Sequence, residues 1–248
     1  MSPTIHVGEM QDIVGLLPAA SFDCILTDPP YGQTSYRWDR RVPGWPAMVR
    51  RLLKPTGSMW VFGSLSSFMA TAGEFAGWKL SQDLIWEKQN GSGFAADRFR
   101  RVHEQAALFY RDDAPWGGVY KNPQVTHDAK ARRVRQPAGR AAHTGPVGAT
   151  IYQTEDGGPR LMRSVLFVRN GHRQGIGHGT PKPEDLLEPM LRYACPSGGR
   201  VLDCFAGSGS TGIVAQRLGF GCTLIEADPE AAANAKSRLI AASSMEAA

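Results

Sequence analysis

The clearest structural pattern in this chain is RVLDCFAGSGSTGIVAQRLGFGCTLIEADPE, residues 200–230. It reads as an apolar strand, a glycine-rich loop, a helix and a second apolar strand. Earlier in the chain, an apolar segment at 22–27, a helical spacing at 48–53, a KPTG turn at 54–57 and an apolar segment at 59–62 repeat the alternation. Strands that alternate with helices form a parallel, doubly wound sheet. We therefore expect an α/β fold whose ligands bind at the carboxyl ends of the strands.

The glycine loop in this stretch predicts the kind of ligand. Gly207, Gly209 and Gly212 follow the pattern G-x-G-x-x-G, and glycines there let a ligand approach the backbone at a helix N-terminus. Asp203 lies four residues before the first glycine, where an anion suits a cationic group better than a phosphate. Glu226 closes the next strand, where a carboxylate can accept both hydroxyls of a ribose. A ribose and an ammonium without a phosphate indicate S-adenosylmethionine.

The composition is that of a globular protein, with 42% hydrophobic and 21% charged residues in a chain of 248. There is no run of eighteen apolar residues, and the first ten residues lack the basic and apolar parts of a signal peptide. We therefore expect a cytoplasmic protein without a membrane segment. The four cysteines form no C-x-x-C pair and lie in or beside apolar segments, which favours buried core residues over disulfides or a metal site.

The positive charge is concentrated in residues 121–143, KNPQVTHDAKARRVRQPAGRAAH. Six lysines and arginines against one aspartate give this segment the same net charge, +5, as the whole chain. Such a cluster is typical of a phosphate-binding surface, and a solvated loop is the alternative. It lies in a longer stretch, from about 112, where apolar periodicity fades and SVLFV at 164–168 alone resembles a strand. A long stretch of this kind in a compact protein is usually functional or disordered.

Three motifs occur in a specific order: DPPY at 28–31, HGTPKP at 178–183 and LDCFAGSGSTG at 202–212. In this order they resemble the beta class of DNA amino-methyltransferases. In that family the D-P-P-Y motif precedes the cofactor motif, which is a circular permutation of the methyltransferase sheet. The resemblance covers nearly the whole chain except about 112–170.

The resemblance implies a doubly wound, mostly parallel sheet of the S-adenosylmethionine-dependent methyltransferase type, circularly permuted. Residues 1–111 and 171–248 are expected to form the catalytic and cofactor-binding domain, and 112–170 a basic, inserted target-recognition region. The break in the sheet falls after the strand that ends at Glu226. The segment at 5–9 is then expected to continue the sheet from the other end of the chain.

In this family the methyl acceptor is an amino nitrogen of adenine or cytosine, a poor nucleophile because its lone pair is delocalised into the ring. The resemblance assigns the catalytic role to Asp28, Pro29, Pro30 and Tyr31. The Asp28 carboxylate and the Pro29 carbonyl are candidates to accept the amino hydrogens and orient the lone pair toward the methyl group. The two prolines fix the backbone after the strand. Tyr31 offers a face on which the extruded base can stack.

The resemblance also implies the cofactor contacts. The family pattern H-x-T-x-K-P places His178, Thr180 and Lys182 along the methionine side of the cofactor, with Pro181 standing where the family usually has Gln. Glu9 occupies the place of a family aspartate near the cofactor's adenine, and a surface glutamate is the alternative. The other expected contacts are Asp28, Asp203, Phe205, Ala206, Gly207, Gly209 and Glu226.

Two basic groups are expected to hold DNA phosphates, and some of their side chains to reach base edges. The first consists of Arg98, Arg100 and Arg101, and lies between two strand candidates, DLIWEK at 83–88 and EQAALFYR at 104–111. The second consists of Lys121, Lys130, Arg132, Arg133 and Arg135. His103 and Glu104, after the first group, resemble the family's H-E pair and are expected to shape the pocket or to be structural.

These features predict a site-specific methyltransferase that moves a methyl group from S-adenosylmethionine to adenine N6 in double-stranded DNA, with base flipping. We expect a homodimer without a metal, acting alone or in a restriction–modification system. Cytosine N4 is the alternative acceptor, because D-P-P-Y occurs with both bases. A methyltransferase for RNA or for a protein glutamine, and a DNA-binding regulator that has lost activity, remain open. A dehydrogenase would leave the DPPY and HGTPKP motifs unexplained. A P-loop is excluded, because no G-K-[ST] follows the glycines.

Overall fold

The protein is described by a computed structural model, which covers residues 2–36, 38–92, 96–136, 150–169 and 181–246. It divides into two compact units, a first unit of residues 1–122 and 164–248 and a second unit of residues 123–163. Among the described residues, no helix is both long and apolar enough to cross a membrane.

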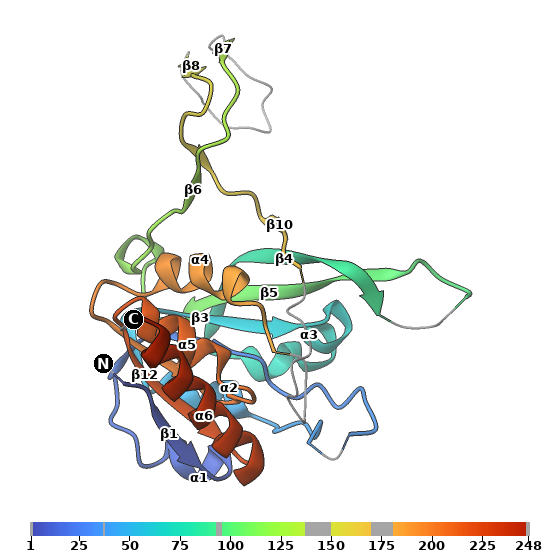
Figure 1. The fold of residues 1–248 in the computed structure, drawn as a ribbon, viewed down its shortest axis with the longest axis vertical. Coiled ribbons are helices and arrows are strands. Elements are labelled where there is room, and N and C mark those ends of the chain that lie inside the picture. The colour runs from blue at the N-terminus through green and yellow to red at the C-terminus, as the bar shows by residue number, and fades with distance from the viewer. Residues whose placement is uncertain (1, 37, 93–95, 137–149, 170–180, 247–248) are drawn as a thin grey trace. The chain divides into compact units, whose positions relative to one another are not determined.

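The first unit is built on an eight-stranded sheet in the order β1-β12-β11-β2-β3-β5-β4-β10 (Figure 1). Five neighbouring strands, from β1 to β3 in that order, run parallel, whereas β5 is antiparallel to both β3 and β4. The sheet confirms the predicted α/β, mostly parallel fold. Its strands are β1 (Thr4–Val7), β2 (Phe22–Thr27), β3 (Leu53–Gly63), β4 (Trp78–Ser92), β5 (Arg101–Arg111), β10 (Val165–Phe167), β11 (Arg200–Asp203) and β12 (Gly221–Glu226).

Strands from the two ends of the chain lie side by side in this sheet. β1 pairs with β12 in parallel, from Thr4 opposite Thr223 to Val7 opposite Glu226. This pairing confirms that the N-terminal segment continues the sheet beyond β12, as the permuted motif order predicts. Because β11 pairs with β2, the glycine loop and the DPPY segment follow neighbouring strands.

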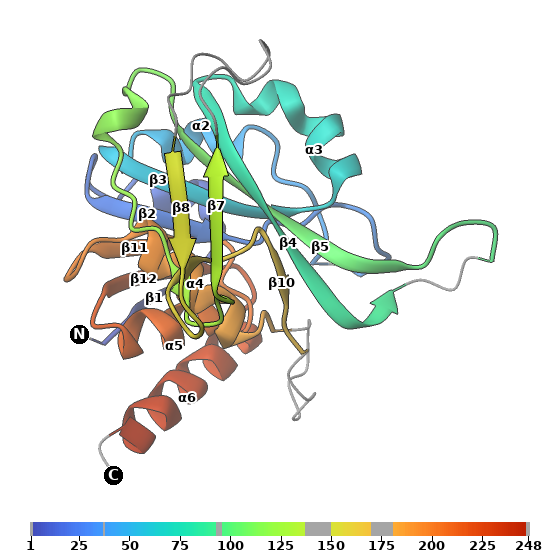
Figure 2. The same ribbon diagram turned by 90° about the horizontal axis from the view of Figure 1, so that it is seen from above.

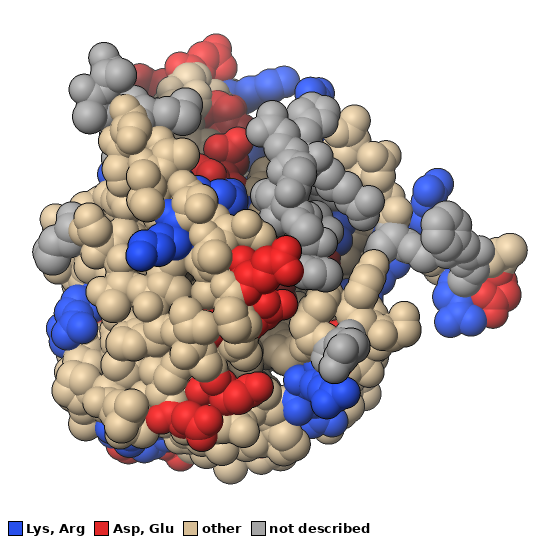
Figure 3. Space-filling view, turned by 60° about the horizontal axis from the view of Figure 1, so that its bottom comes forward, with Lys and Arg blue, Asp and Glu red and all other residues tan. Residues whose placement is uncertain are grey.

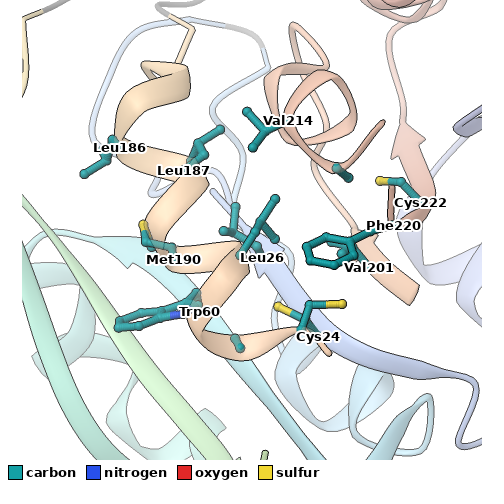
Figure 4. Packing of buried hydrophobic residues seen from close by; sticks show 14 of the residues in the cluster. Cys24, Leu26, Trp60, Leu186, Leu187, Met190, Val201, Val214, Phe220 and Cys222 are labelled. Atoms are coloured by element: carbon teal, nitrogen blue, oxygen red, sulfur yellow. The ribbon is translucent and has the colours of Figure 1, made fainter. Parts of the chain in front are cut away.

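Helices cover both faces of the sheet. On one face, α4 (Glu184–Ala194), α5 (Ser210–Arg217) and α6 (Pro229–Glu246) enclose a core that includes Leu26 and Trp60 (Figure 4). A second core lies on the other face with α1 (Met10–Val14), α2 (Trp45–Arg50), α3 (Leu65–Thr71) and the 3₁₀ helix η1 (Ala72–Phe75). β2 is buried along its whole length, as its nearly continuous apolar sequence predicts. The four cysteines are free and buried, which confirms their assignment to the core.

The local sequence explains where α4 begins. Pro183 is the N-cap, and Glu184 and Asp185 occupy the first turn, where carboxylates offset the positive end of the helix dipole. Leu187 and Met190 then point into the core. The anchored helix start fixes the position of the residue before its cap, Lys182.

β4 and β5 form a long antiparallel hairpin that extends beyond the rest of the sheet (Figures 1 and 2). At its projecting end, on the right in Figure 3, basic and acidic side chains lie together on the surface.

The second unit contains two small antiparallel sheets. β6 (Val125–Thr126) pairs with β9 (Arg160–Leu161), and β7 (Arg132–Gln136) pairs with β8 (Thr150–Thr154). The predicted insert, 112–170, contains this unit together with the 3₁₀ helix η2 (Trp116–Gly118) and β10, which belong to the first unit.

Candidate active site

Four carboxylates follow the ends of neighbouring parallel strands. Asp28 comes directly after β2, Asp203 ends β11, Glu226 ends β12, and Glu9 follows β1. Because these strands are parallel, their carboxyl ends lie at one edge of the sheet. Thr27 joins two of them, since its hydroxyl donates to Asp203 Oδ1 over 2.8 Å. The predicted amino-group acceptor and the predicted ligand carboxylate are therefore adjacent.

The glycine loop turns sharply between β11 and α5. Gly207 has φ 49°, and a Cβ placed on it would meet no atom within 4 Å, so the space beside its backbone is open. Gly209 has φ 75°, and its Cβ would lie 2.9 Å from Ala235 Cβ of α6. The two glycines thus have different roles: the first leaves room beside the loop, and the second lets the loop pack against α6.

Glu226 is held in one orientation by the backbone around it. Its Oε2 accepts a hydrogen bond from Gly207 N at 2.7 Å, and its Oε1 accepts one from Asp228 N at 2.9 Å. Each oxygen keeps a second lone pair, so the carboxylate can still accept a pair of hydroxyl groups. Glu9 is exposed and precedes α1, and Gly8 N donates to Glu226 O over 2.9 Å, which holds the two segments together.

Asp203 is almost completely buried, and its exposed fraction is 4%. Burial raises its pKa to about 6, while hydrogen bonds from Thr211, Thr27 and Phe205 N oppose the rise and the Asp28 charge adds to it. The Asp203 carboxylate lacks a cationic partner among the described residues. A positively charged ligand group at this position would lower its pKa and hold it ionised.

The residues after Asp203 form an apolar wall. Ala206 is buried and its N–H donates to Ile225 O over 2.9 Å, which pins the loop to β12. Phe205 is partly buried, and its ring meets the Trp45 ring edge to face with a centroid distance of 5.7 Å.

The Asp28 carboxylate has a partner on each oxygen. The Tyr31 hydroxyl donates to Oδ1, and the Lys182 ammonium pairs with Oδ2. Burial and the neighbouring Asp28 charge raise the pKa of Tyr31 well above its usual value, so it remains a donor. Sequence reasoning placed Lys182 beside the cofactor and missed its contact with Asp28, because no sequence pattern reports which carboxylate a lysine meets. His178 and Thr180 lie outside the described residues.

A small open hollow lies beside the DPPY segment. Pro29, Pro30 and Tyr31 form part of its wall, and Trp45 and Phe75 form another part. The DPPY segment therefore borders an open hollow on this side.

The loop after the DPPY segment is organised by Asp39, which is 6% exposed. Its carboxylate accepts from the N–H groups of Gly32, Gln33 and Thr34 at 2.7–2.8 Å. Those bonds lower its pKa, although burial opposes them. Sequence reasoning missed Asp39, although an aspartate near Gly and Thr is typical of a turn that such a side chain stabilises.

The predicted DNA contacts differ in environment. Arg98 pairs with Asp97 at 2.7 Å, and Arg100 and Arg101 are exposed. Lys121 is bound within the first unit, because its ammonium donates to Trp116 O and Val119 O and lies 4.7 Å from the Trp116 ring centroid. The remaining four predicted contacts are exposed, and they form no ion pair with any described residue. They are Lys130, Arg132, Arg133 and Arg135.

Known proteins share sequence and fold with this chain. Among proteins of known activity, the chain is 27% identical over 200 residues to the Type II methyltransferase M2.DpnII of Streptococcus pneumoniae, covering 79% of this chain. The chain spans 65% of the length of that relative.

Solved structures share the fold. The M1.HpyAVI complex with SAM has a TM-score of 0.63 and 22% identity, covering 95% of this chain and 98% of that one. The cytosine-N4-specific PvuII DNA methyltransferase has a TM-score of 0.67 and 17% identity, covering 96% of this chain and 86% of that one. The family model described as DNA methylase, for N6 and N4 methyltransferases, matches residues 22–237. The resemblance drawn from the motifs is thus confirmed, and the chain belongs to the N6/N4 DNA methylase family.

Proposed function

We propose that this protein transfers a methyl group from S-adenosylmethionine to the N6 amino group of adenine in double-stranded DNA, with the target base turned out of the helix. The observation that carries the proposal is the Thr27 link between Asp28 and Asp203, which sets an amino-group acceptor beside a carboxylate suited to a cation. Family membership supports the same chemistry.

The residues present fit S-adenosylmethionine, which supplies the electrophilic methyl group. The open space beside Gly207 accommodates a ligand against the loop backbone, and the buried Asp203 carboxylate suits the ligand's ammonium. Glu226 accepts the ribose hydroxyls with its remaining lone pairs. Phe205 and Ala206 supply apolar contacts, and Glu9 lies near the adenine end. Lys182 and the two positions outside the described residues, His178 and Thr180, complete the proposed set.

Asp28 and Pro29 activate the acceptor in this proposal. The Asp28 carboxylate accepts one hydrogen of the amino group, and the Pro29 carbonyl accepts the other, so the nitrogen lone pair turns toward the methyl group. Both acceptors also stabilise the positive charge that develops on the nitrogen during transfer. Pro30 holds the backbone, and the Tyr31 ring stacks on the turned-out base.

Adenine and cytosine both present an exocyclic amino group, so the pocket chemistry serves either base. We assign adenine because the motif begins with aspartate in a permuted chain, whereas a serine start leans toward cytosine. Cytosine N4 is the second candidate, and the fold shared with the cytosine-N4-specific PvuII enzyme favours keeping it.

DNA is held by two basic surfaces in this proposal. The hairpin tip contributes Arg98, Arg100 and Arg101. The insert, 112–170, serves as the target-recognition region, whose proposed contacts are Lys121, Lys130, Arg132, Arg133 and Arg135. We propose a homodimer, because the family commonly forms one, and a place in a restriction–modification system.

The test is to incubate the purified protein with labelled S-adenosylmethionine and mixed-sequence duplex DNA, digest the DNA to nucleosides and identify the labelled one. N6-methyladenine nucleoside is the expected product. N4-methylcytosine nucleoside would move the assignment to the second candidate. Label in neither would leave an RNA or protein substrate, or a regulator without activity.

A further inference from the structure

Lys182 lies between two carboxylates at the proposed active site. Its ammonium pairs with Asp28 Oδ2, and its Nζ lies 3.4 Å from Glu104 Oε2. The same ammonium lies 4.9 Å from the centroid of the buried Phe62 ring. The exposed fraction of the Lys182 side chain is 14%, so water screens its attraction to either carboxylate only weakly.

Glu104 is held from its other side. The Lys88 ammonium donates to Glu104 Oε1 and lies 4.8 Å from the ring centroid of Trp86, which is directly opposite Glu104 in the β4–β5 register. Trp86 is fixed in turn, because its Nε1 donates to Val168 O over 2.8 Å. The Glu104 carboxylate therefore has little freedom to move.

The remaining oxygen of Glu104 is unsatisfied. Oε2 is buried, lies within ion-pair distance of Lys182, and accepts no hydrogen bond from any described residue. A buried acceptor without a hydrogen bond is unfavourable, so we expect a donor to reach this oxygen at some step. Among the described residues, the Lys182 ammonium, whose Nζ lies 3.4 Å away, is the candidate donor.

The charges around Lys182 keep it an ammonium. Burial lowers its pKa, but Asp28 and Glu104 raise the pKa above its usual value. Burial raises the pKa of Glu104, but Lys182 and Lys88 bring the pKa below its usual value. Lys182 therefore has two anionic partners. In the structure its ammonium is hydrogen-bonded to Asp28, the carboxylate that the proposed chemistry needs.

We propose that Glu104 is a positioning residue that receives the Lys182 ammonium when the amino group of the target base reaches Asp28. The hydrogen bond passes from Asp28 Oδ2 to Glu104 Oε2. Asp28 thereby gains a free oxygen for the amino hydrogen, and Glu104 gains its missing donor. No proton is transferred, and the net charge of the site is unchanged. The inference rests on the proposed function, because it assumes that an amino group binds at Asp28.

The test compares Glu104→Gln with Glu87→Gln, which removes a carboxylate from an exposed position on the same hairpin. With no anion to receive it, Lys182 stays on Asp28, and we expect the single-turnover rate at saturating cofactor and DNA to fall at least about tenfold. Dissociation constants for both ligands should stay within about twofold, a change worth less than about 0.5 kcal/mol. Glu87→Gln should behave like the unmodified protein.

A pH profile separates this role from a structural one. Lys182 loses one of its two anions in Glu104→Gln, so its pKa falls and it leaves Asp28 more readily as pH rises. The rate deficit should narrow as pH rises, and Glu104→Asp, which keeps the charge, should recover part of the rate. A Glu104→Gln rate equal to that of Glu87→Gln, or a deficit independent of pH, would overturn the proposal.

A second measurement does not depend on activity. Lysine side chains labelled with ¹³C at Cε are titrated by NMR, and the Lys182 signal is identified by its loss in Lys182→Met. In Asp28→Asn, Glu104 is the remaining carboxylate that can receive the ammonium, so adding Glu104→Gln should lower the Lys182 pKa further. If the unmodified protein methylates no DNA, the proposed function fails, and this titration alone decides whether Glu104 receives the ammonium. An unchanged pKa on adding Glu104→Gln would refute the role.

Discussion

Charged side chains in two regions of this protein differ in burial and pairing. At one edge of the large sheet, the Lys182 ammonium lies within ion-pair distance of both Asp28 and Glu104, and the Lys182 and Glu104 side chains are largely withdrawn from water. On β7, Arg132 and Arg133 are exposed and form no ion pair within the described part of the chain. Buried pairs are held in fixed geometry and are weakly screened by salt, whereas exposed cations are strongly screened. The first region suits chemistry on one positioned group, and the second suits a polyanion that supplies its own charges.

Removing Asp28 should have the largest effect among the charged side chains at the edge of the large sheet. Asp28→Ala deletes the acceptor that orients the amino nitrogen, so we expect the methyl-transfer rate to fall at least about 10³-fold. Cofactor affinity should change by a few-fold at most, because Asp203 and Glu226 are untouched. The measurement is single-turnover transfer together with calorimetric titration of S-adenosylmethionine. Asp83→Ala, an exposed aspartate on β4, is the control, and equal rates in the two variants would remove Asp28 from the chemistry.

Replacing the exposed cations of the second unit tests the other side of the comparison, because the resulting loss of DNA affinity should depend on salt concentration. With Lys130, Arg132, Arg133 and Arg135 all replaced by alanine, we expect duplex affinity to fall about 10²-fold near 0.15 M salt. The slope of log affinity against log salt should shrink by roughly 0.9 for each lost phosphate contact. Equilibrium binding at several salt concentrations measures both quantities.

The control for the arginine-rich segment is Lys236→Ala on α6, which removes an exposed cation elsewhere. It should leave the salt slope unchanged. A quadruple variant with an unaltered slope would mean that the segment is a solvated loop rather than a phosphate-binding surface.

Asp203 is also buried at this edge of the sheet, but it lacks a cationic partner among the described residues, which distinguishes it from Asp28. Asp203→Asn keeps the shape of the side chain and removes its charge, so affinity for S-adenosylmethionine at pH 7.5 should fall about tenfold. In the unmodified protein, affinity should also decline below about pH 6, where this carboxyl becomes protonated. Calorimetric titrations at several pH values test both points against Asp12→Asn, an exposed control on α1. The same pH dependence in Asp203→Asn would assign the titration to another group.

Sequence reasoning located the strands and the loop because their signals are local. The apolar run at 22–27, the glycines after β11 and the proline at the start of α4 each fix backbone conformation through the residues themselves. The order of the motifs also predicted that β1 would continue the sheet beside β12. The KPTG segment at 54–57 is different: it reads as a turn, but the structure includes it in β3, where the register with β2 shifts.

The contacts of charged side chains could not be predicted in the same way. Lys182 and Glu104 come together because α4 starts near the β4–β5 hairpin, and this depends on packing of the whole core. Likewise, the link from Thr27 to Asp203 joins two strands that are adjacent only in the folded sheet. Sequence patterns could therefore nominate residues for the proposed site, whereas they could not predict which charged side chains contact one another.

The last expected effect concerns the stability of the unliganded protein. The pKa of Asp203 is about 6 in the folded protein, and an unfolded aspartate titrates near 4, so the folded state binds more protons between these values. This carboxyl therefore reduces stability as pH rises through that window, by up to about 3 kcal/mol above pH 6. Asp203→Asn cannot titrate and should gain stability relative to the unmodified protein over the same window. Carboxyls with lowered pKa, such as Glu188, titrate in the opposite sense in both proteins and cancel from the difference. Urea unfolding without cofactor at pH 4.5 and pH 7.5 measures that difference, and a value independent of pH would show that Asp203 is ionised at little cost in the fold.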